Sequence, residues 1–168
     1  VQTCALPILD HHFPFAFETL VEIREGRYQH LDIWDMFSEA ILKNEVTKEG
    51  VVTRDYKLMI RTALPLVAQK LLANGEPLSC DETTNYYKDK KEFTSLTVLR
   101  LANSAIQFRE TSLYTPDGEG KSKRRIDIEA NVKIPGIGKL IEKLIVYEFK
   151  EQSGVDLQRI LKFHKDNY

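Results

Sequence analysis

The sequence has few of the features that define disulfide-rich, metal-stapled or membrane-spanning proteins. It contains two cysteines, Cys4 and Cys80, and no Cys-x-x-Cys pair, which excludes a disulfide framework and a zinc ribbon. No run of 18 apolar residues occurs, so no transmembrane helix is predicted. Neither charge sign is in excess: 24 Lys and Arg residues face 25 Asp and Glu residues, for a net charge of −1. This balance argues against a strongly basic nucleic-acid binder and against an acidic disordered tail.

Catalytic and cofactor motifs are also missing. There is no Gly-x-Ser-x-Gly, His-Glu-x-x-His, Walker A or Gly-x-Gly-x-x-Gly pattern. The run Pro135–Gly138 lacks the Lys-Ser/Thr of a phosphate loop and is predicted to be a tight turn. The four histidines are not at ligand spacing, so we expect neither a metal nor a cofactor. Cys80 has no recognisable His partner and is expected to be a small buried side chain.

What remains is an ordinary globular composition. The 168 residues, 42% of them hydrophobic, suffice for one domain with its own core. Residues 1–8 look like the translation of a sequencing-library adapter, so we expect a scar there and a single domain over residues 9–168. With Cys4 in the scar, Cys80 has no internal partner, which favours a reducing compartment.

Hydrophobic periodicity predicts an α+β protein. We expect a short strand over 9–13, a helix over 12–28 with Pro14 in its first turn, and a short helix or apolar loop over 31–37. Period-two patterns then predict six strands, mostly in hairpins, interrupted by a short amphipathic helix within 63–77. The strands are expected over 38–46, 51–62, 78–87, 93–101, 105–114 and 125–134.

A long amphipathic helix is predicted over 137–165. Its apolar stripe runs through Ile137, Leu140, Ile141, Leu144, Ile145 and Phe149 and continues through Leu157, Ile160 and Leu161. Leu144 lies at the centre of the stripe and is expected to be buried. Gly154 predicts a weak point or kink. Such a helix must bury its stripe, and the concave face of the sheet is the available surface. The predicted architecture is therefore a curved antiparallel sheet of about six to seven strands gripping one long C-terminal helix.

This order of elements is similar to the helix-grip arrangement of the START-like superfamily, over nearly the whole chain from Leu9. One branch that it resembles is the PRELI-type phospholipid-transfer family, and another is a group of uncharacterised bacterial START-like domains. The PRELI-type motifs are Phe13-Pro14-Phe15, Arg27-Tyr28, the run from Glu45 through Gly50 to Arg54, Leu64-Pro65, and Arg109-Glu110 through Tyr114-Thr115-Pro116. The bacterial pattern is Val132 through Gly138, followed by Ile141-Glu142-Lys143-Leu144.

Two charges interrupt otherwise apolar strand faces. Arg54 lies among Val52, Tyr56 and Leu58 on one strand, and Glu110 lies among Ile106, Phe108, Ser112 and Tyr114 on another. A buried lone charge is costly, so each needs a partner. Two interpretations stay open: the two residues reach water or pair with each other, or they hold the headgroup of a ligand, for which an Arg fork suits a phosphate. The candidate ligand-binding residues are Arg54, Tyr56, Leu58, Phe108, Glu110 and Tyr114.

The apolar insertion at 63–77 is a second candidate. The PRELI-type resemblance implies a lid that touches the membrane, formed here by Leu66, Val67, Lys70 and Leu71; a helix packed permanently over the cavity mouth is the alternative. The basic residues Lys121, Lys123, Arg124 and Arg125 are expected to form a solvated turn.

The resemblance implies a non-enzymatic protein that binds, and transfers, a lipid or other hydrophobic molecule. It implies transient membrane contact and no nucleic acid. A cytoplasmic location is expected, or the mitochondrial intermembrane space for a true PRELI-type protein. A START-like polyketide cyclase or aromatase and a ligand-free interaction module are the alternatives. The enzyme would need an acid–base pair in the cavity, which Glu110, Arg54 and a few tyrosines could supply.

Overall fold

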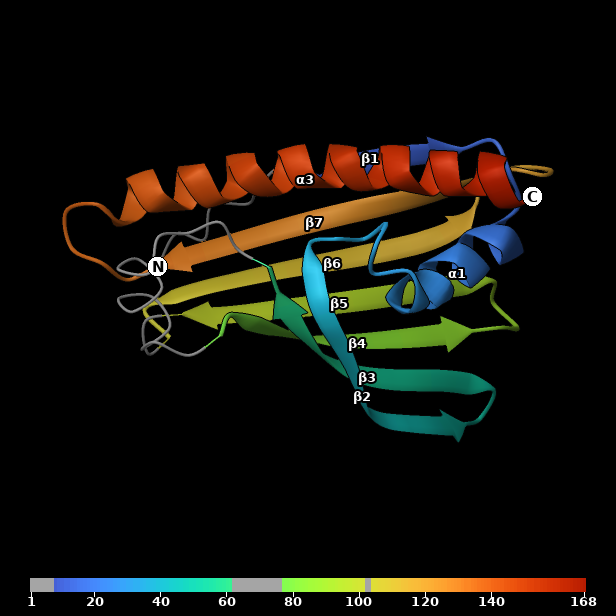
Figure 1. The fold of residues 1–168 in the computed structure, drawn as a ribbon, viewed down its shortest axis with the longest axis horizontal. Coiled ribbons are helices and arrows are strands. Elements are labelled where there is room, and N and C mark those ends of the chain that lie inside the picture. Colours follow the sequence, from blue (N-terminus) through green and yellow to red (C-terminus); the bar gives the residue numbers. More distant parts are fainter. Residues whose placement is uncertain (1–7, 62–76, 102–103) are drawn as a thin grey trace.

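The computed structural model describes residues 8–61, 77–101 and 104–168. Within these ranges it forms one seven-stranded antiparallel sheet in the order β1-β7-β6-β5-β4-β3-β2, with two α-helices on one face (Figure 1). The strands are β1 (Leu9–Phe13), β2 (Phe37–Lys48), β3 (Val51–Ile60), β4 (Ser79–Tyr87), β5 (Glu92–Leu101), β6 (Ile106–Pro116) and β7 (Ser122–Val132). The helices are α1 (Phe17–Gly26), a 3-10 turn η1 (Arg27–Gln29) and α3 (Gly138–Asn167).

Hairpin pairing organises the sheet as the period-two pattern predicts. β2 through β7 pair consecutively, and β1 closes the other edge against β7 with Leu9 opposite Ile126. The β2–β3 turn is tight because Glu49 and Gly50 both have positive φ, 51° and 78°. Alternation is clearest in β7, where Ile126 and Ile128 are buried and the intervening Asp127 is exposed. The predicted fold class is confirmed.

The first helix starts later than the sequence predicts. α1 begins at Phe17, not at His12, because residues up to Phe13 are held in β1 by pairing with β7. Pro14 therefore lies in the bend between strand and helix. Residues 30–36 form successive turns, so the loop alternative is correct there.

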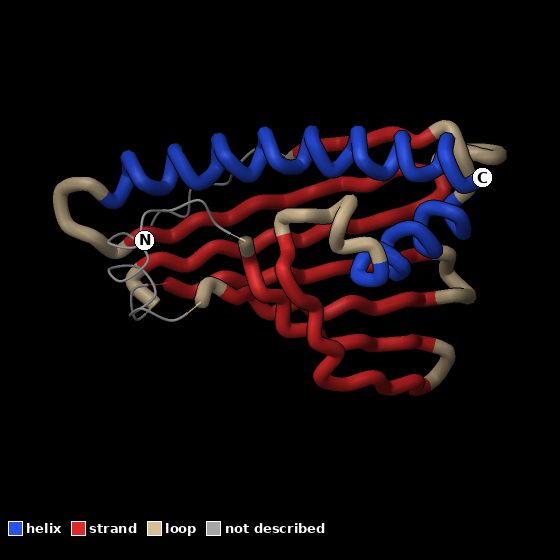
Figure 2. Tube along the Cα trace, viewed as in Figure 1, coloured by secondary structure: helices blue, strands red, loops and turns tan. Residues whose placement is uncertain are grey.

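The C-terminal helix lies along the inward face of the sheet, over β7 (Figures 1 and 2). The helix is continuous from Gly138 to Asn167 and is not interrupted at Gly154, where a weak point or kink is predicted. The turn predicted at Pro135–Gly138 is confirmed: Gly138 N–H donates to the Ile134 carbonyl at 2.9 Å. A side chain at position 138 would come within 2.6 Å of the Val132 carbonyl oxygen, so only glycine fits there.

The buried face of α3 agrees with the predicted stripe only in part. Ile145 and Phe149 pack against the sheet and Ile160 is buried, but Leu140 and Leu144 are 60% and 59% exposed. Val146, Ser153 and Asp156 are buried as well. The apolar residues of the first turns cover more than one face, so their spacing alone does not fix the rotation of the helix. The C-terminal half fixes it, because Ile160 packs in the main core and Asp156 binds the sheet. The burial predicted for Leu144 is therefore wrong.

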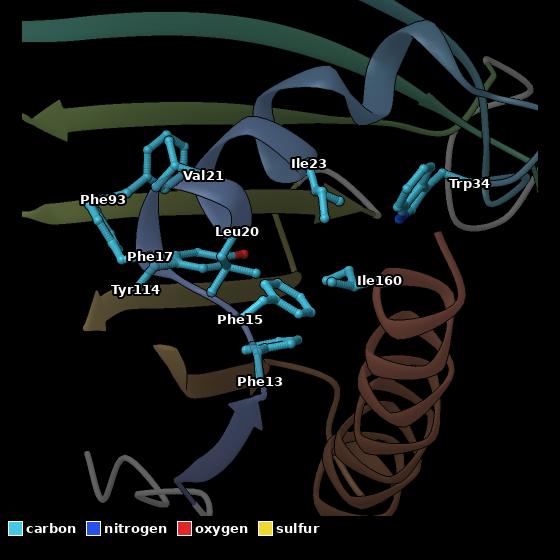
Figure 3. Close-up of a cluster of buried hydrophobic side chains, with 10 residues drawn as sticks. All are labelled: Phe13, Phe15, Phe17, Leu20, Val21, Ile23, Trp34, Phe93, Tyr114 and Ile160. Carbon is cyan, nitrogen blue, oxygen red and sulfur yellow. The ribbon is translucent and has the colours of Figure 1, made fainter. Parts of the chain in front are cut away.

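The main core lies where α1, the C-terminal half of α3 and the sheet meet. Figure 3 shows its side chains converging from all three elements, with Phe93 and Tyr114 contributed by the sheet. Phe93 and Tyr114 meet edge to face, with ring centroids 5.4 Å apart. None of the described helices is long and apolar enough to cross a membrane. The core residues are Phe13, Phe15, Phe17, Leu20, Val21, Ile23, Trp34, Phe93, Tyr114 and Ile160.

Candidate functional site

The middle of the inward face is polar. Strand register places Tyr56, Glu82, Thr97, Glu110 and Ile128 in one row across β3 to β7. Side chains directly opposite each other on neighbouring strands are about 5 Å apart, so this row forms a continuous strip under the helices. Buried polar side chains need hydrogen-bond partners. Some residues of this row have several partners, and others have few.

Glu82 is the centre of the first buried cluster. Its carboxylate is 1% exposed and accepts hydrogen bonds from Arg24 Nη2 at 2.7 Å and Arg27 Nη2 at 3.0 Å. Thr97 Oγ1 donates to it at 3.2 Å, and the Tyr28 hydroxyl donates to its other oxygen. Burial alone would raise the pKa of Glu82, but the two guanidinium groups outweigh burial and hold the pKa below its usual value.

Asp156 on α3 is the centre of the second buried cluster. It accepts from Arg124 Nη1 of β7 at 2.5 Å and from Trp34 Nε1 at 3.0 Å. Burial acts to raise the pKa of Asp156, but Arg124 opposes it and the pKa falls to about 2. Arg124 itself is 3% exposed, so its prediction as part of a solvated turn is wrong. The alternation of β7 places it on the inward face with Ile126 and Ile128.

Tyr114 connects the two clusters. Its hydroxyl accepts from Arg24 Nε at 3.1 Å and from Arg124 Nη1 at 3.5 Å. Tyr114 is also one of the ligand contacts predicted from the sequence, and in the structure its hydroxyl lies between two arginines inside the core. The network thus runs without interruption from Glu82 on β4 to Asp156 on α3.

Glu110 is the exception in the polar row. Within the described ranges, its carboxylate has a single hydrogen bond, from Ser112 Oγ at 3.3 Å, and no ion pair. It points to the same inward face as Phe108 and Ser112, and burial raises the pKa of its carboxyl above the usual value. A desolvated carboxyl can accept a hydrogen bond when ionised and donate one when protonated.

Arg54 lies elsewhere and is already paired. Its guanidinium binds Glu25 of α1 and Glu45 of β2, the latter at 2.5 Å. The sequence-based alternative in which Arg54 pairs with Glu110 is therefore wrong. A role as a headgroup anchor would require a ligand to compete with two carboxylates.

The remaining predicted contacts are apolar or aromatic. Leu58 and Phe108 are fully buried, and Phe108 stacks on Phe149 of α3 with ring centroids 3.5 Å apart. Tyr56 is half-buried and packs against Tyr28 at 4.8 Å. Burial raises the pKa of the Cys80 thiol to about 12, which fits the predicted inert side chain. The predicted lid residues, Leu66, Val67, Lys70 and Leu71, lie outside the described residues.

Sequence reasoning missed the arginines of the network. Arg24 follows Leu20 and Val21 at i+4 and i+3, which is the buried face of α1, and this spacing was the available signal. Glu82 likewise alternates with Cys80 and Thr84 on the inward face of β4. A search for charged residues at buried positions of both helices and strands would have found Arg24 and Glu82.

Among the described residues, three buried arginine nitrogens have no hydrogen-bond partner. Arg27 Nε and Arg124 Nε belong to the buried network, and Arg159 Nη1 lies on α3. No cluster of three or more potential metal ligands occurs among the described residues. The polar row therefore offers a ligand the Glu110 carboxyl, which accepts one hydrogen bond, and the network beside it contains two unpaired guanidinium N–H groups.

Comparison with solved structures identifies the fold. The chain resembles the Zhui aromatase/cyclase from Streptomyces sp. R1128, with a TM-score of 0.64, 8% identity, and coverage of 95% of this chain and 93% of that one. It also resembles a START superfamily protein from Mycobacterium smegmatis, with a TM-score of 0.58, 11% identity, and coverage of 95% and 99%. Norcoclaurine synthase from Thalictrum flavum matches with a TM-score of 0.58, 12% identity, and coverage of 96% and 87%.

These likenesses establish the START-like helix-grip fold predicted from the sequence, and they include enzymes. At such low identity they show the fold alone, and the PRELI-type branch is not specifically supported. A search of curated proteins finds no match to this sequence. A family model described as "Protein of unknown function (DUF2505)" matches residues 11–156, and the chain belongs to that family.

Proposed function

We propose that this protein binds a small hydrophobic molecule on the inward face of the sheet, beneath the N-terminal half of α3, with the Glu110 carboxyl at the polar end of the site. START-like folds support such binding, because a sheet curled around a helix leaves a tapered interior. Binding would be driven by apolar burial, at about 0.8 kcal/mol per methylene.

The observation that carries the proposal is the incomplete burial around Glu110. Glu110 lies deep enough for burial to raise its carboxyl pKa, yet its side chain is only half-buried. The inward-facing Thr97, Leu99 and Ala130 beside it are half-buried as well. Towards the other end of the same face, Ser112 and Tyr114 are fully buried under the core. We infer that the half-buried region borders space for a ligand.

Membrane-to-membrane transfer is a further step of this proposal. The helix-grip fold would carry the ligand if its cover could open, and the lid expected at 63–77 would be that cover. The PRELI-type resemblance remains the reason to expect a lipid as cargo.

An enzyme of the cyclase type is the second candidate, and Glu110 is the reason to keep it. A carboxyl whose pKa is raised by burial is suited to proton transfer. The likeness to an aromatase/cyclase agrees with this possibility at the level of the fold.

The test is to fill the proposed site. Native mass spectrometry of gently purified protein, followed by organic extraction, should reveal a copurified small molecule. Ala130→Trp places a large ring on the inward face, and the variant should no longer carry the small molecule. Leu113→Trp is the control, because Leu113 faces outward on β6 and is exposed. A wild-type protein that carries and takes up no small molecule would support the ligand-free module instead.

A further inference from the structure

We infer that the interior ligand is a neutral molecule with a hydroxyl group that donates a hydrogen bond to Glu110. The inference rests on the proposed function and names the chemical class of its ligand. It differs from the anionic lipid that Arg54 suggests in the sequence.

Charge balance in the interior is the first argument. Among the described residues, three arginines are buried, Arg24, Arg27 and Arg124, together with two carboxylates, Glu82 and Asp156. With Glu110 ionised, the three positive charges face three negative ones and the interior is neutral. A cationic or an anionic ligand would each leave one uncompensated charge in a poorly solvated region, which is costly. A neutral ligand keeps the balance.

Hydrogen-bond capacity is the second argument. A carboxylate has roughly four acceptor positions, and Glu110 receives one donor, from Ser112. Thr97, opposite Glu110 on β5, already donates its hydroxyl to Glu82. Ile128, opposite Glu110 on β7, has no side-chain donor. Neither neighbouring side chain fills the free acceptor positions of Glu110, and a ligand hydroxyl would supply a donor there without adding a charge.

The surroundings define the rest of the ligand. One row further along the inward face lie Leu99 and Phe108, and Phe108 is stacked on Phe149. Ile128 and Ile145 belong to the same apolar cluster. A hydroxyl at one end and an apolar body at the other, as in a phenol or an alcohol with a ring system, would match this arrangement.

The unpaired arginine donors do not favour an anion. The Arg27 guanidinium lies 4.8 Å from the Tyr28 ring centroid and 5.5 Å from that of Phe37, and Arg124 lies 5.8 Å from that of Tyr114. Both residues are buried, at 8% and 3% exposed, and their guanidinium groups lie against aromatic rings, which leaves little room for an anion.

Four naphthalenes that differ in one group test the inference. The binding of 2-naphthol, 2-methoxynaphthalene, 2-naphthoate and 2-naphthylmethylamine is measured by calorimetry at pH 7. We expect 2-naphthol to bind about tenfold more tightly than 2-methoxynaphthalene, as one hydrogen bond to a charged acceptor implies, and more tightly than both ions. Glu110→Leu should remove the difference between naphthol and its methyl ether. The control Glu129→Leu, on the outward face of β7, should preserve it.

The outcomes separate the inference from the proposed function. If naphthol and its ether bind equally and Ala130→Trp abolishes both, interior binding stands and the hydroxyl inference is overturned. If naphthoate binds best, the arginines are the anchor and the inference is also overturned. If none of the four binds, both proposals fail for molecules of this size. Should Glu110→Leu fail to fold, Glu110→Gln replaces it, and a weakened preference for naphthol is expected because a neutral amide is a poorer acceptor.

Discussion

Arg124 on β7 and Asp156 on α3 form a buried ion pair, 2.5 Å between Nη1 and Oδ2, that joins the C-terminal helix to the sheet. Breaking one side of such a pair leaves an uncompensated charge in the core. We expect Asp156→Asn to lower the free energy of unfolding by about 3 kcal/mol, measured by urea denaturation at pH 7. If Asp156→Asn lowered the free energy of unfolding no more than the substitution of an exposed Asp does, α3 would be held to the sheet mainly by Ile160 and its apolar neighbours.

The same pair predicts a specific loss of stability in acid. Burial acts to raise the pKa of Asp156, but the attraction of Arg124 opposes burial, and the pKa is about 2, against 3.8 for an ordinary Asp. Because the folded pKa is lower than the unfolded one, the contribution is complete above about pH 4 and is lost as the pH falls towards 2. The difference in pKa corresponds to about 2 kcal/mol. Stability measured from pH 5 to 2 should fall less steeply in Asp156→Asn than in the wild type.

Glu82 should be the most sensitive carboxylate in the molecule. Glu82→Gln leaves Arg24 and Arg27 facing each other without a counter-ion, and we expect a loss of about 3–5 kcal/mol. Glu129→Gln, on the exposed face of β7, is the matched control and should change stability by less than about 0.5 kcal/mol. Equal effects of the two variants would mean that the cluster is hydrated in solution.

Strand faces were predictable from the sequence, and the buried face of α3 was predictable only in part. Alternation in β7 correctly identified Ile126 and Ile128 as inward-facing, because side chains on a strand have only two directions. On α3 the apolar residues surround more than one face, so the rotation of the helix depends on where Asp156 meets Arg124. That contact joins segments distant in the chain and leaves no periodic signal.

The candidate site shows the same limit. The sequence identified Glu110 as an odd charge on an inward face, and the structure leaves it with one weak partner. It also identified Arg54, but the partners of Arg54 come from α1 and β2, whose proximity depends on the tertiary fold.

The rotation of α3 yields a direct test with two charge insertions. Leu144→Asp places the charge on the exposed side of the helix, so it should fold cooperatively with a loss of at most about 1 kcal/mol. Ile160→Asp places it in the main core, at a side chain that is 1% exposed, and should prevent folding. Circular dichroism thermal melts of both variants measure the difference. Unfolding by Leu144→Asp would show that the outer side of α3 is covered in solution.

Arg54→Met separates a structural role from ligand binding. Arg54 and its partners Glu25 and Glu45 are all partly exposed, so the variant should lose at most about 1 kcal/mol of stability. The loss should shrink in 1 M sodium chloride, since the Debye length there is about 3 Å and salt weakens exposed ion pairs. Affinity for 2-naphthol should be unchanged, because Glu110 rather than Arg54 supplies the polar contact.

The decisive comparison is transfer of anionic phospholipid between vesicles. If Arg54→Met abolished transfer while leaving the thermal midpoint unchanged, Arg54 would be the headgroup anchor and its pairs with Glu25 and Glu45 would have to open when the ligand binds.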